Sequence, residues 1–202
     1  MTLSLDPAEL GPREAYRLFV SVVVPRPIAW VSTVSLAGVT NLAPYSFFNG
    51  VAGPPPVVMW AAGQRHGAPK DSLSNAIETG EFVVNLADRS LAEALNLSSG
   101  DWAPDVSEFE LAGLEAVPSE VVRPPRVALA PVALEARVTQ VVPVTGTTST
   151  MVLGEVVRFH IRPDLLGPDG LVLASRFAPI ARLGRDEYSE LGEVFSMARP
   201  GR

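Results

Sequence analysis

Proline and glycine interrupt this chain so often that long helices are excluded over most of its length. Its 202 residues include 19 prolines and 16 glycines, and proline removes a backbone donor and breaks helix interiors. The apolar segments between these breaks are mostly short and rich in β-branched or aromatic residues. They cover residues 28–34, 39–45, 57–62, 81–86, 132–142 and 150–161. Short strands with Gly/Pro-rich turns and few helices are typical of a β-barrel or β-sandwich with accessory helices.

Two segments have the pattern of a helix. In residues 70–80, Asp71 or Ser72 is suited to be the N-cap, apolar residues recur at helical spacing, and Gly80 is suited to end the helix. Residues 88–96 are predicted to form a second, shorter helix.

The remaining segments are predicted to be irregular. Residues 1–17 are interpreted as an N-terminal arm that is broken at Gly11-Pro12. Residues 98–126 are interpreted as loops, and residues 163–202 as a tail punctuated by glycine and proline. The length fits a single domain over residues 1–202.

The charge balance excludes some classes of partner. The chain has 22 acidic and 16 basic residues, a net charge of -6, and Lys70 as its only lysine. Nucleic-acid binding needs clustered basic residues, and the sequence has no such cluster. No apolar run approaches the ~18 residues of a membrane helix, no signal peptide is recognisable, and cysteine is absent. We therefore expect a cytoplasmic protein without a membrane or nucleic-acid partner and without thiolate chemistry.

A first polar cluster, Ser32-Thr33 with Ser35, ends a predicted strand that is otherwise apolar. Its hydroxyls could donate to a polar or anionic ligand. Serine and threonine also stand in strands and turns for structural reasons alone, so both interpretations stay open.

A second cluster runs from Asn41 to Asn49. It combines two amides, the hydroxyl of Ser46, three aromatic rings and the proline Pro44. This mixture is typical of a site where a flat heteroaromatic ring stacks and backbone groups bind its edge. A core strand with polar ends is the alternative.

A third cluster, Lys70-Asp71-Ser72, stands where the first predicted helix begins. The free N–H groups and the positive dipole end of a helix favour an anion there, and a lysine and a hydroxyl would add to a phosphate site. The glycines of a phosphate-binding loop are missing. An ordinary N-cap beside a solvated lysine is the alternative.

Other polar residues predict no site. His66 and His160 are isolated, so no metal site is expected, and His160 should be packed or hydrogen-bonded within a strand. Glu108 and Glu110 are interpreted as the solvated edge of a strand.

Several blocks of the sequence, taken in order, resemble the flavin reductase-like family, also described as the FMN-binding split barrel. The blocks are residues 25–33, 41–49, 70–72, 81–86, 154–161 and 181–184 with Tyr188, and together they span roughly residues 20–200. The resemblance implies a mainly β fold with accessory helices, a Greek-key split β-barrel of the FMN-binding type. It also implies a homodimer with FMN near the subunit interface.

Carried over residue by residue, the resemblance implies an FMN site in several parts. Beside the ribityl chain and phosphate would lie Ser32 and Thr33. The phosphate end would be bound by Lys70, Asp71 and Ser72. The isoalloxazine would be bordered by Tyr45, Ser46, Phe47, Phe48 and Asn49, with backbone groups addressing N5, O4 and N3. The remaining predicted cofactor contacts are Arg26, Trp30, Asn41, Ala43 and Pro44.

The resemblance further implies an FMN-dependent oxidoreductase that uses NAD(P)H in a flavin reductase reaction, with a monooxygenase or other redox partner. The flavin carries this chemistry, so no catalytic side chain is predicted. Many reductases of the family carry a nicotinamide-associated histidine four residues before the glycine that corresponds to Gly154, and this chain has Thr150 there. A flavoredoxin-like electron-transfer protein, reduced by a partner, is therefore the main alternative. A module for another flat phosphorylated ligand, such as a pyridoxal compound, is the third.

Three features predict a homodimer whose cofactor sites need both chains. Charged residues make up only 19% of the chain. Residues 57–62 form a continuous apolar run, so both of its faces should be covered. The tail has few elements of its own to pack on, and it carries residue types that are enriched at interfaces. These are Arg176, Phe177, Arg182 and Tyr188. The alternative is a tail that folds back on its own barrel.

Overall fold

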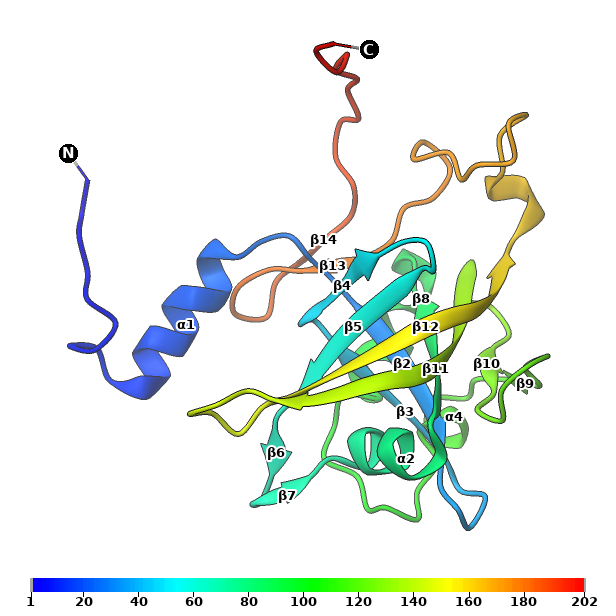
Figure 1. The fold of residues 1–202 in the computed structure, drawn as a ribbon, viewed down its shortest axis with the longest axis horizontal. Coiled ribbons are helices and arrows are strands. Elements are labelled where there is room, and N and C mark those ends of the chain that lie inside the picture. Colours follow the sequence, from blue (N-terminus) through cyan, green and yellow to red (C-terminus); the bar gives the residue numbers. More distant parts are fainter. Residues whose placement is uncertain (1, 202) are drawn as a thin grey trace.

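The computed structural model describes residues 2–201. Seven strands form one antiparallel sheet in the order β3-β2-β8-β11-β12-β5-β4 (Figure 1). They are β2 (Ala29–Val34), β3 (Thr40–Tyr45), β4 (Phe48–Ala52), β5 (Val57–Ala62), β8 (Glu81–Leu86), β11 (Val132–Pro143) and β12 (Thr150–Ile161). Strands β3 and β4 stand at opposite ends of this order, yet only Ser46 and Phe47 separate them along the chain. The sheet therefore has to curl into a barrel.

All six predicted strand segments are confirmed within a few residues. The mainly β class with accessory helices is confirmed as well. Smaller strands add three short sheets, in which β1 pairs with β13 and β13 with β14, β6 with β7, and β9 with β10. Their bounds are β1 (Arg26–Pro27), β6 (Gln64–Arg65), β7 (Ala68–Pro69), β9 (Ala116–Val117), β10 (Arg126–Val127), β13 (Ala181–Arg182) and β14 (Tyr188–Ser189).

Helix α2 (Asp71–Thr79) confirms the clearest helix prediction. Its N-cap is Lys70 rather than Asp71 or Ser72, and Gly80 ends it with a left-handed φ of 71°. Leu73 and Ala76 pack into the barrel core. The second predicted helix is a 3₁₀ turn, η1 (Arg89–Leu91), that continues into α3 (Ala92–Leu97).

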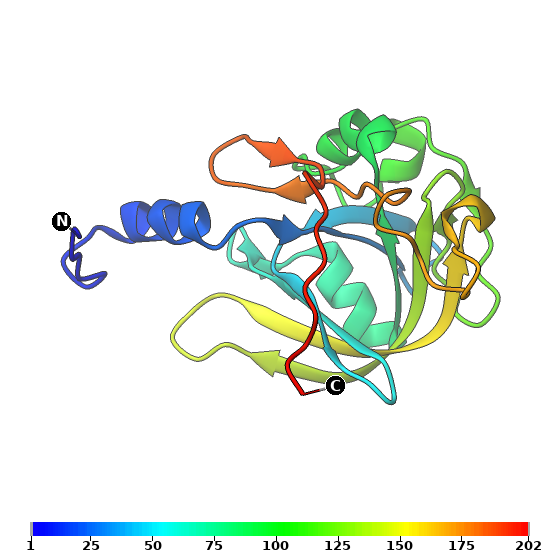
Figure 2. The ribbon, with the colours of Figure 1, turned by 90° about the horizontal axis from the view of Figure 1, so that it is seen from above.

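The prediction of an irregular N-terminal arm is wrong for its second half. Helix α1 (Pro12–Val22) begins at the expected break, with Gly11 as N-cap. Proline is favoured in the first turn of a helix, where no intrahelical partner for its N–H is needed. Figures 1 and 2 show α1 standing outside the barrel. The region predicted as loops also contains one short helix, α4 (Glu108–Leu111), besides β9 and β10.

Two apolar clusters hold the fold together. The barrel interior contains Trp60 and Phe82, whose rings meet edge to face with centroids 5.8 Å apart. Gly154 of β12 faces this pair, and a Cβ there would lie 2.5 Å from the Phe82 ring, so the packing of this ring on β12 requires glycine. The second cluster, outside the barrel, packs Trp30 and Leu42 against α3 and α4.

Strand β5 differs from its predicted environment. Within one chain its burial alternates, so that Val58, Trp60 and Ala62 are buried and the other face is only half covered. The expectation that both faces are covered is therefore not met within a single chain.

The predicted tail does not leave the domain at once. A 3₁₀ turn, η2 (Pro163–Leu165), and Ile180 are packed into the two clusters, and β13 pairs with β1. The four residues predicted as interface anchors all make contacts within their own chain: Arg176 donates to the carbonyls of Asp164 and Leu166, Phe177 packs on the barrel core, and Arg182 stacks on the Tyr188 ring. The segment after β14 runs away from the barrel (Figure 1).

None of the helices within residues 2–201 is long and apolar enough to cross a membrane.

Candidate functional site

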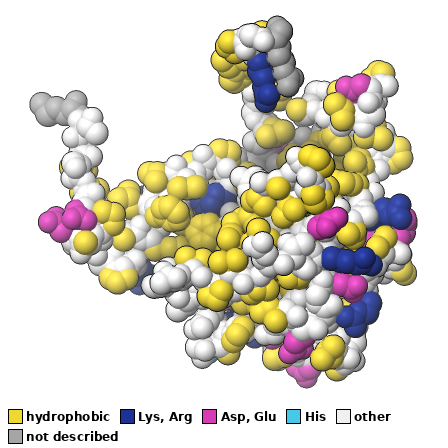
Figure 3. All heavy atoms as spheres, in the orientation of Figure 1, with side chains coloured by type: hydrophobic (Ala, Val, Ile, Leu, Met, Phe, Trp, Pro, Cys, Tyr) yellow, Lys and Arg dark blue, Asp and Glu magenta, His cyan; other side chains and the backbone are white. Residues whose placement is uncertain are grey.

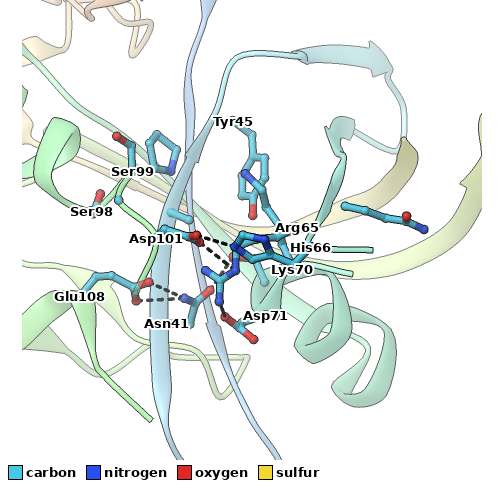
Figure 4. Close-up of a pocket in the computed structure, with 15 residues that line it drawn as sticks. Asn41, Tyr45, Arg65, His66, Lys70, Asp71, Ser98, Ser99, Asp101 and Glu108 are labelled. Atoms are coloured by element: carbon cyan, nitrogen blue, oxygen red, sulfur yellow. Dashed lines mark hydrogen bonds and ion pairs between the residues drawn. The ribbon is translucent and has the colours of Figure 1, made fainter. Parts of the chain in front are cut away.

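One cleft brings together the second and third polar clusters of the sequence. It lies between β3, the β6–β7 hairpin, the start of α2 and residues 98–101, and has a volume of about 280 Å³ (Figure 4). We call it the β3 cleft. Its lining residues are Asn41, Ala43, Pro44, Tyr45, Gln64, Arg65, His66, Lys70, Asp71, Ser72, Ser98, Ser99, Gly100, Asp101 and Glu108.

Seven of the predicted cofactor contacts lie in this cleft. They are Asn41, Ala43, Pro44, Tyr45, Lys70, Asp71 and Ser72. The sequence separates the two groups by about 25 residues, and they meet because α2 packs across β2 and β3. The geometry fits the expected ligand site, whereas their contact with a cofactor stays a prediction.

Three predicted contacts lie behind the cleft rather than in its wall. Trp30, Ser32 and Thr33 are fully buried. The Trp30 indole donates to the Ser98 hydroxyl over 2.8 Å, and the Ser32 hydroxyl donates to the carbonyl of Pro125. Their side chains support the site from the core.

The other predicted contacts lie farther along the chain. Phe47, Phe48 and Asn49 line none of the clefts described in this section. Ser46 lines two other clefts. One of them shares Pro44 and Ser99 with the β3 cleft, and the other, between α1 and the β13–β14 hairpin, is also lined by Arg26. Arg26 is buried and donates to the carbonyls of Val20, Val23 and Leu183.

A buried polar network connects α4, β3 and α2. The Glu108 carboxylate accepts hydrogen bonds from the Asn41 amide over 2.8 and 2.9 Å and from the Leu42 N–H over 2.8 Å. On its other side, Asn41 Oδ1 accepts a bond from the Ser72 hydroxyl. Glu108 is only 6% exposed, so its prediction as a solvated edge residue is wrong. It lies on a helix whose first turn faces the core.

This network fixes which way each group points. An ionised carboxylate can only accept, so the NH₂ of Asn41 faces Glu108 and its carbonyl oxygen faces Ser72. The Ser72 proton is therefore committed to Asn41. A phosphate at the start of α2 would be bound by backbone N–H groups and cationic side chains rather than by this hydroxyl.

The basic side chains of the β3 cleft differ in whether a carboxylate pairs with them. Arg65 pairs with Asp101 over 2.9 Å and with Asp71 over 3.4 Å, and His66 pairs with Asp101. Bonding to His66, aided by Arg65, lowers the pKa of Asp101. Lys70 makes no ion pair with any residue in the range 2–201, and its Nζ lies 5.5 Å from the centre of the Tyr45 ring. Lys70 is thus the cation at this cleft that is available to an anionic ligand.

The Tyr45 hydroxyl is a second unsatisfied group. It is buried and makes no hydrogen bond within residues 2–201, and burial raises the pKa of Tyr45 well above its ordinary value of 10.0. Its ring stacks on Trp60 with centroids 4.7 Å apart. The hydroxyl is closed off from the cleft, so the face of the Tyr45 ring, rather than its hydroxyl, is the part that meets Lys70.

Sequence reasoning missed the residues of the cleft that come from other elements. Arg65, His66, Asp101 and Glu108 lie in short hairpins, loops and a one-turn helix. No local pattern distinguishes these residues from solvated loop residues.

Comparison with known proteins identifies the family. The model of the flavin reductase-like domain matches residues 21–181. The chain belongs to the flavin reductase-like family. The predicted split-barrel fold is confirmed by this match and by the solved structures of the family.

Two solved structures show how close the similarity is. Nitrilotriacetate monooxygenase component B from Bacillus cereus has 37% sequence identity and a TM-score of 0.94, with 98% of this chain and 99% of that chain covered. The 2-nitrobenzoate 2-nitroreductase of Pseudomonas fluorescens has 32% identity and a TM-score of 0.89, with 98% and 97% covered. An uncharacterized protein of Halalkalibacterium halodurans is 41% identical, over 98% of this chain and 97% of its own.

Proposed function

We propose that this protein binds FMN at the β3 cleft and acts as an oxidoreductase that transfers hydride from NAD(P)H to the flavin. The observation that carries the proposal is the pairing of an uncompensated cation, Lys70, with the start of α2, directly beside the backbone of β3. Membership of the flavin reductase-like family supports it.

The residues present fit this cofactor. Lys70 and the free N–H groups at the first turn of α2 would bind the phosphate, because both favour an anion. Ala43, Pro44 and Tyr45 line the cleft beside it and would border the flavin ring. When bound, FMN supplies a ring that accepts hydride, while the protein orients it and tunes its potential.

The electron donor is inferred from the named relatives and from one residue of β12. The two solved relatives are named as a monooxygenase component and a nitroreductase, which supports a redox reaction for this chain. Thr150 opens β12 opposite Ala62 and lines none of the three clefts, so the residue does not replace the missing histidine there. This favours the alternative of a carrier that is reduced by a protein partner.

An absorption spectrum tests FMN binding, and a reduction assay tests the electron donor. Purified protein should show oxidised-flavin bands after addition of FMN and should lose them on addition of NADH or NADPH. Bleaching by dithionite alone would assign the carrier role. Absence of any flavin spectrum at saturating FMN would overturn the proposal.

The phosphate assignment has its own test. Lys70→Ala should weaken FMN about ten- to a hundredfold, the value of a hydrogen bond to a charged group, and leave riboflavin unchanged because riboflavin has no phosphate. Arg158→Ala, an exposed arginine on β12, is the control. Equal losses for FMN and riboflavin would show that the phosphate lies elsewhere.

We also propose that the working unit is a homodimer. Apolar side chains spread over α1 and the neighbouring barrel face (Figure 3), and Tyr16, Phe19 and Val22 of α1 are at least half exposed. The segment after β14 exposes Val194, Phe195 and Met197. Exposed apolar side chains gathered in this way are typical of an interface. Light scattering over a dilution series should give twice the 21.5 kDa chain mass, and a stable monomer that binds FMN would contradict this.

A further inference from the structure

We infer that a cleft lined by arginines, next to the β3 cleft, binds the anionic group of the small molecule that exchanges electrons with the flavin. The binding site itself is argued from charge and shape. Its role rests on the proposed function.

The cleft lies between α1 and the β13–β14 hairpin and has a volume of about 1120 Å³. We call it the α1 cleft. Five arginines line it: Arg13, Arg17, Arg26, Arg182 and Arg185. Only two carboxylates, Glu14 and Asp186, line it as well. An excess of three positive charges thus gathers in one hollow of a chain whose net charge is -6.

Most of these arginines have no carboxylate partner. Within residues 2–201, Arg13, Arg17 and Arg185 make no ion pair, and Arg182 reaches Asp186 only at 3.8 Å. Asp186 is fully exposed to solvent, so it screens little of this charge. The hollow therefore keeps a positive potential that attracts anions.

Arg26 forms the inner wall. Its guanidinium donates to carbonyl oxygens at the end of α1, Val20 over 2.6 Å and Val23 over 2.8 Å, and to Leu183 over 2.8 Å. These bonds hold α1 against the β13–β14 hairpin and so create the cleft. They use neutral acceptors, so the charge of this buried side chain is not cancelled by an anion of the described chain.

Arg182 stands where the α1 cleft approaches the candidate flavin site. It also lines an intermediate cleft of about 570 Å³, together with Ser46 and Tyr188. That cleft shares Pro44 and Ser99 with the β3 cleft. The guanidinium lies over the Tyr188 ring, 4.5 Å from its centre. Its Nη2 donates to the carbonyl of Arg185, which fixes the guanidinium and leaves its Nε and Nη1 groups to donate to a ligand.

The placement defines the class of ligand. A molecule anchored at Arg182 could extend past Ser46 toward Pro44, which the proposed function places beside the flavin. Guanidinium groups bind carboxylates and phosphates through paired hydrogen bonds. The ligand is therefore an organic oxyanion, and its charge can come from an aromatic carboxylate or from the phosphates of a dinucleotide.

Helix α1 divides its exposed side chains between two sides. Phe19 and Val22 are exposed but do not line the cleft, whereas Arg13 and Arg17, one turn apart, line it together with Tyr16. A second copy of the chain seated on Phe19 and Val22 would leave Arg13 and Arg17 facing the cleft.

Arg182→Gln in the full chain tests the inference. Binding of benzoate and of NADPH would be titrated with and without FMN, each against an uncharged counterpart, benzamide and dihydronicotinamide riboside. We expect about a ten- to hundredfold loss for the anion that the cleft takes, equivalent to one charge-assisted bond, and no loss for its uncharged counterpart. Loss for benzoate assigns the carboxylate source, and loss for NADPH assigns the phosphate source.

Two further variants keep the test decisive. Arg17→Gln, on the exposed surface of α1, should weaken the same anion severalfold without touching the β13–β14 hairpin. Arg158→Gln, remote from the cleft and paired with Glu120, should change nothing. An equal loss in Arg158→Gln, or wild-type binding of neither anion in preference to its uncharged counterpart, would overturn the inference.

Flavin titration separates this inference from the proposed function. If Arg182→Gln weakens FMN but not riboflavin, the cleft holds the phosphate of FMN itself and the inference is wrong. If the wild type binds no FMN, the proposed function fails, whereas anion binding by the apoprotein is still measured independently.

Discussion

Two buried glutamates, Glu108 at the β3 cleft and Glu135 on β11, differ in the number and kind of their hydrogen-bond donors. Glu108 accepts bonds from an asparagine amide and one backbone N–H. Glu135 of β11, which is fully buried, accepts three backbone N–H groups, from Glu120, Val121 and Val122, and pairs with His160. His160 of β12 is hydrogen-bonded to Glu135 of the neighbouring strand, so the prediction of a hydrogen-bonded histidine in a strand is confirmed.

The number and charge of the donors decide how each carboxylate titrates. Burial raises the pKa of Glu108, and the bonds from Leu42 and Asn41 do not offset it. Burial also opposes ionisation of Glu135, but its four donors together lower the pKa below the ordinary value of 4.5. Glu135 is thus a stabilising anchor for residues 120–122, whereas Glu108 is a costly group kept beside the candidate site.

The largest effect should come from removing the anchor. Glu135→Ala leaves three N–H groups and His160 without their acceptor, and we expect the free energy of unfolding to fall by about 3–5 kcal/mol. Urea unfolding measures this, with Glu135→Gln as an intermediate case that keeps one acceptor oxygen. A loss under 1 kcal/mol, within the ordinary range for a single neutral hydrogen bond, would remove the distinction between the two glutamates.

A smaller loss is expected at the site. Glu108→Gln keeps one acceptor oxygen, which can take the bonds from Leu42 and Asn41 that now share Oε2. Its NH₂ group then faces the NH₂ of Asn41 in place of the other oxygen, so one bond of the network is lost. We expect about 1–2 kcal/mol of destabilisation, and weaker FMN binding because the network no longer fixes α2 against β3. If stability fell while FMN affinity stayed unchanged in a titration of folded protein, the network would serve the core alone.

The smallest effect, and the sharpest comparison, is the pH dependence. Folded Glu108 holds its proton to higher pH than the unfolded chain, so its contribution to stability falls as pH rises from 4.5 through the folded pKa. The contribution of Glu135 is complete above 4.5 and is lost as pH falls through its lowered folded pKa. Subtracting the unfolding curves of Glu108→Gln and Glu135→Gln from the wild type should give slopes of opposite sign. Slopes of equal sign would refute the assigned pKa directions.

The sequence carried most of the strand pattern because each strand is a short apolar run between breakers. Residues 81–86 and 150–161 match their strands residue for residue, and Gly80 ends α2 as predicted. Sequence reasoning does not place helix α1, because Gly11 and Pro12 are typical both of a break in the chain and of a helix start. The first half of the tail packs on the barrel and its last residues do not. Composition does not predict this division, because glycine and proline punctuate the whole tail.

The sequence by itself determined the β-rich class, the family blocks and the two polar clusters that lie in the β3 cleft, because these depend on residues near one another in the chain. The tertiary structure decided which hydroxyls face a ligand and which face the core, and placed Ser32 and Thr33 in the core. It also turned Glu108 from a surface residue into the acceptor that orients Asn41, and gathered arginines from α1, β1 and β13 into one cleft. These outcomes depend on contacts across the barrel, where burial and hydrogen-bond direction are set by partners that no local pattern specifies.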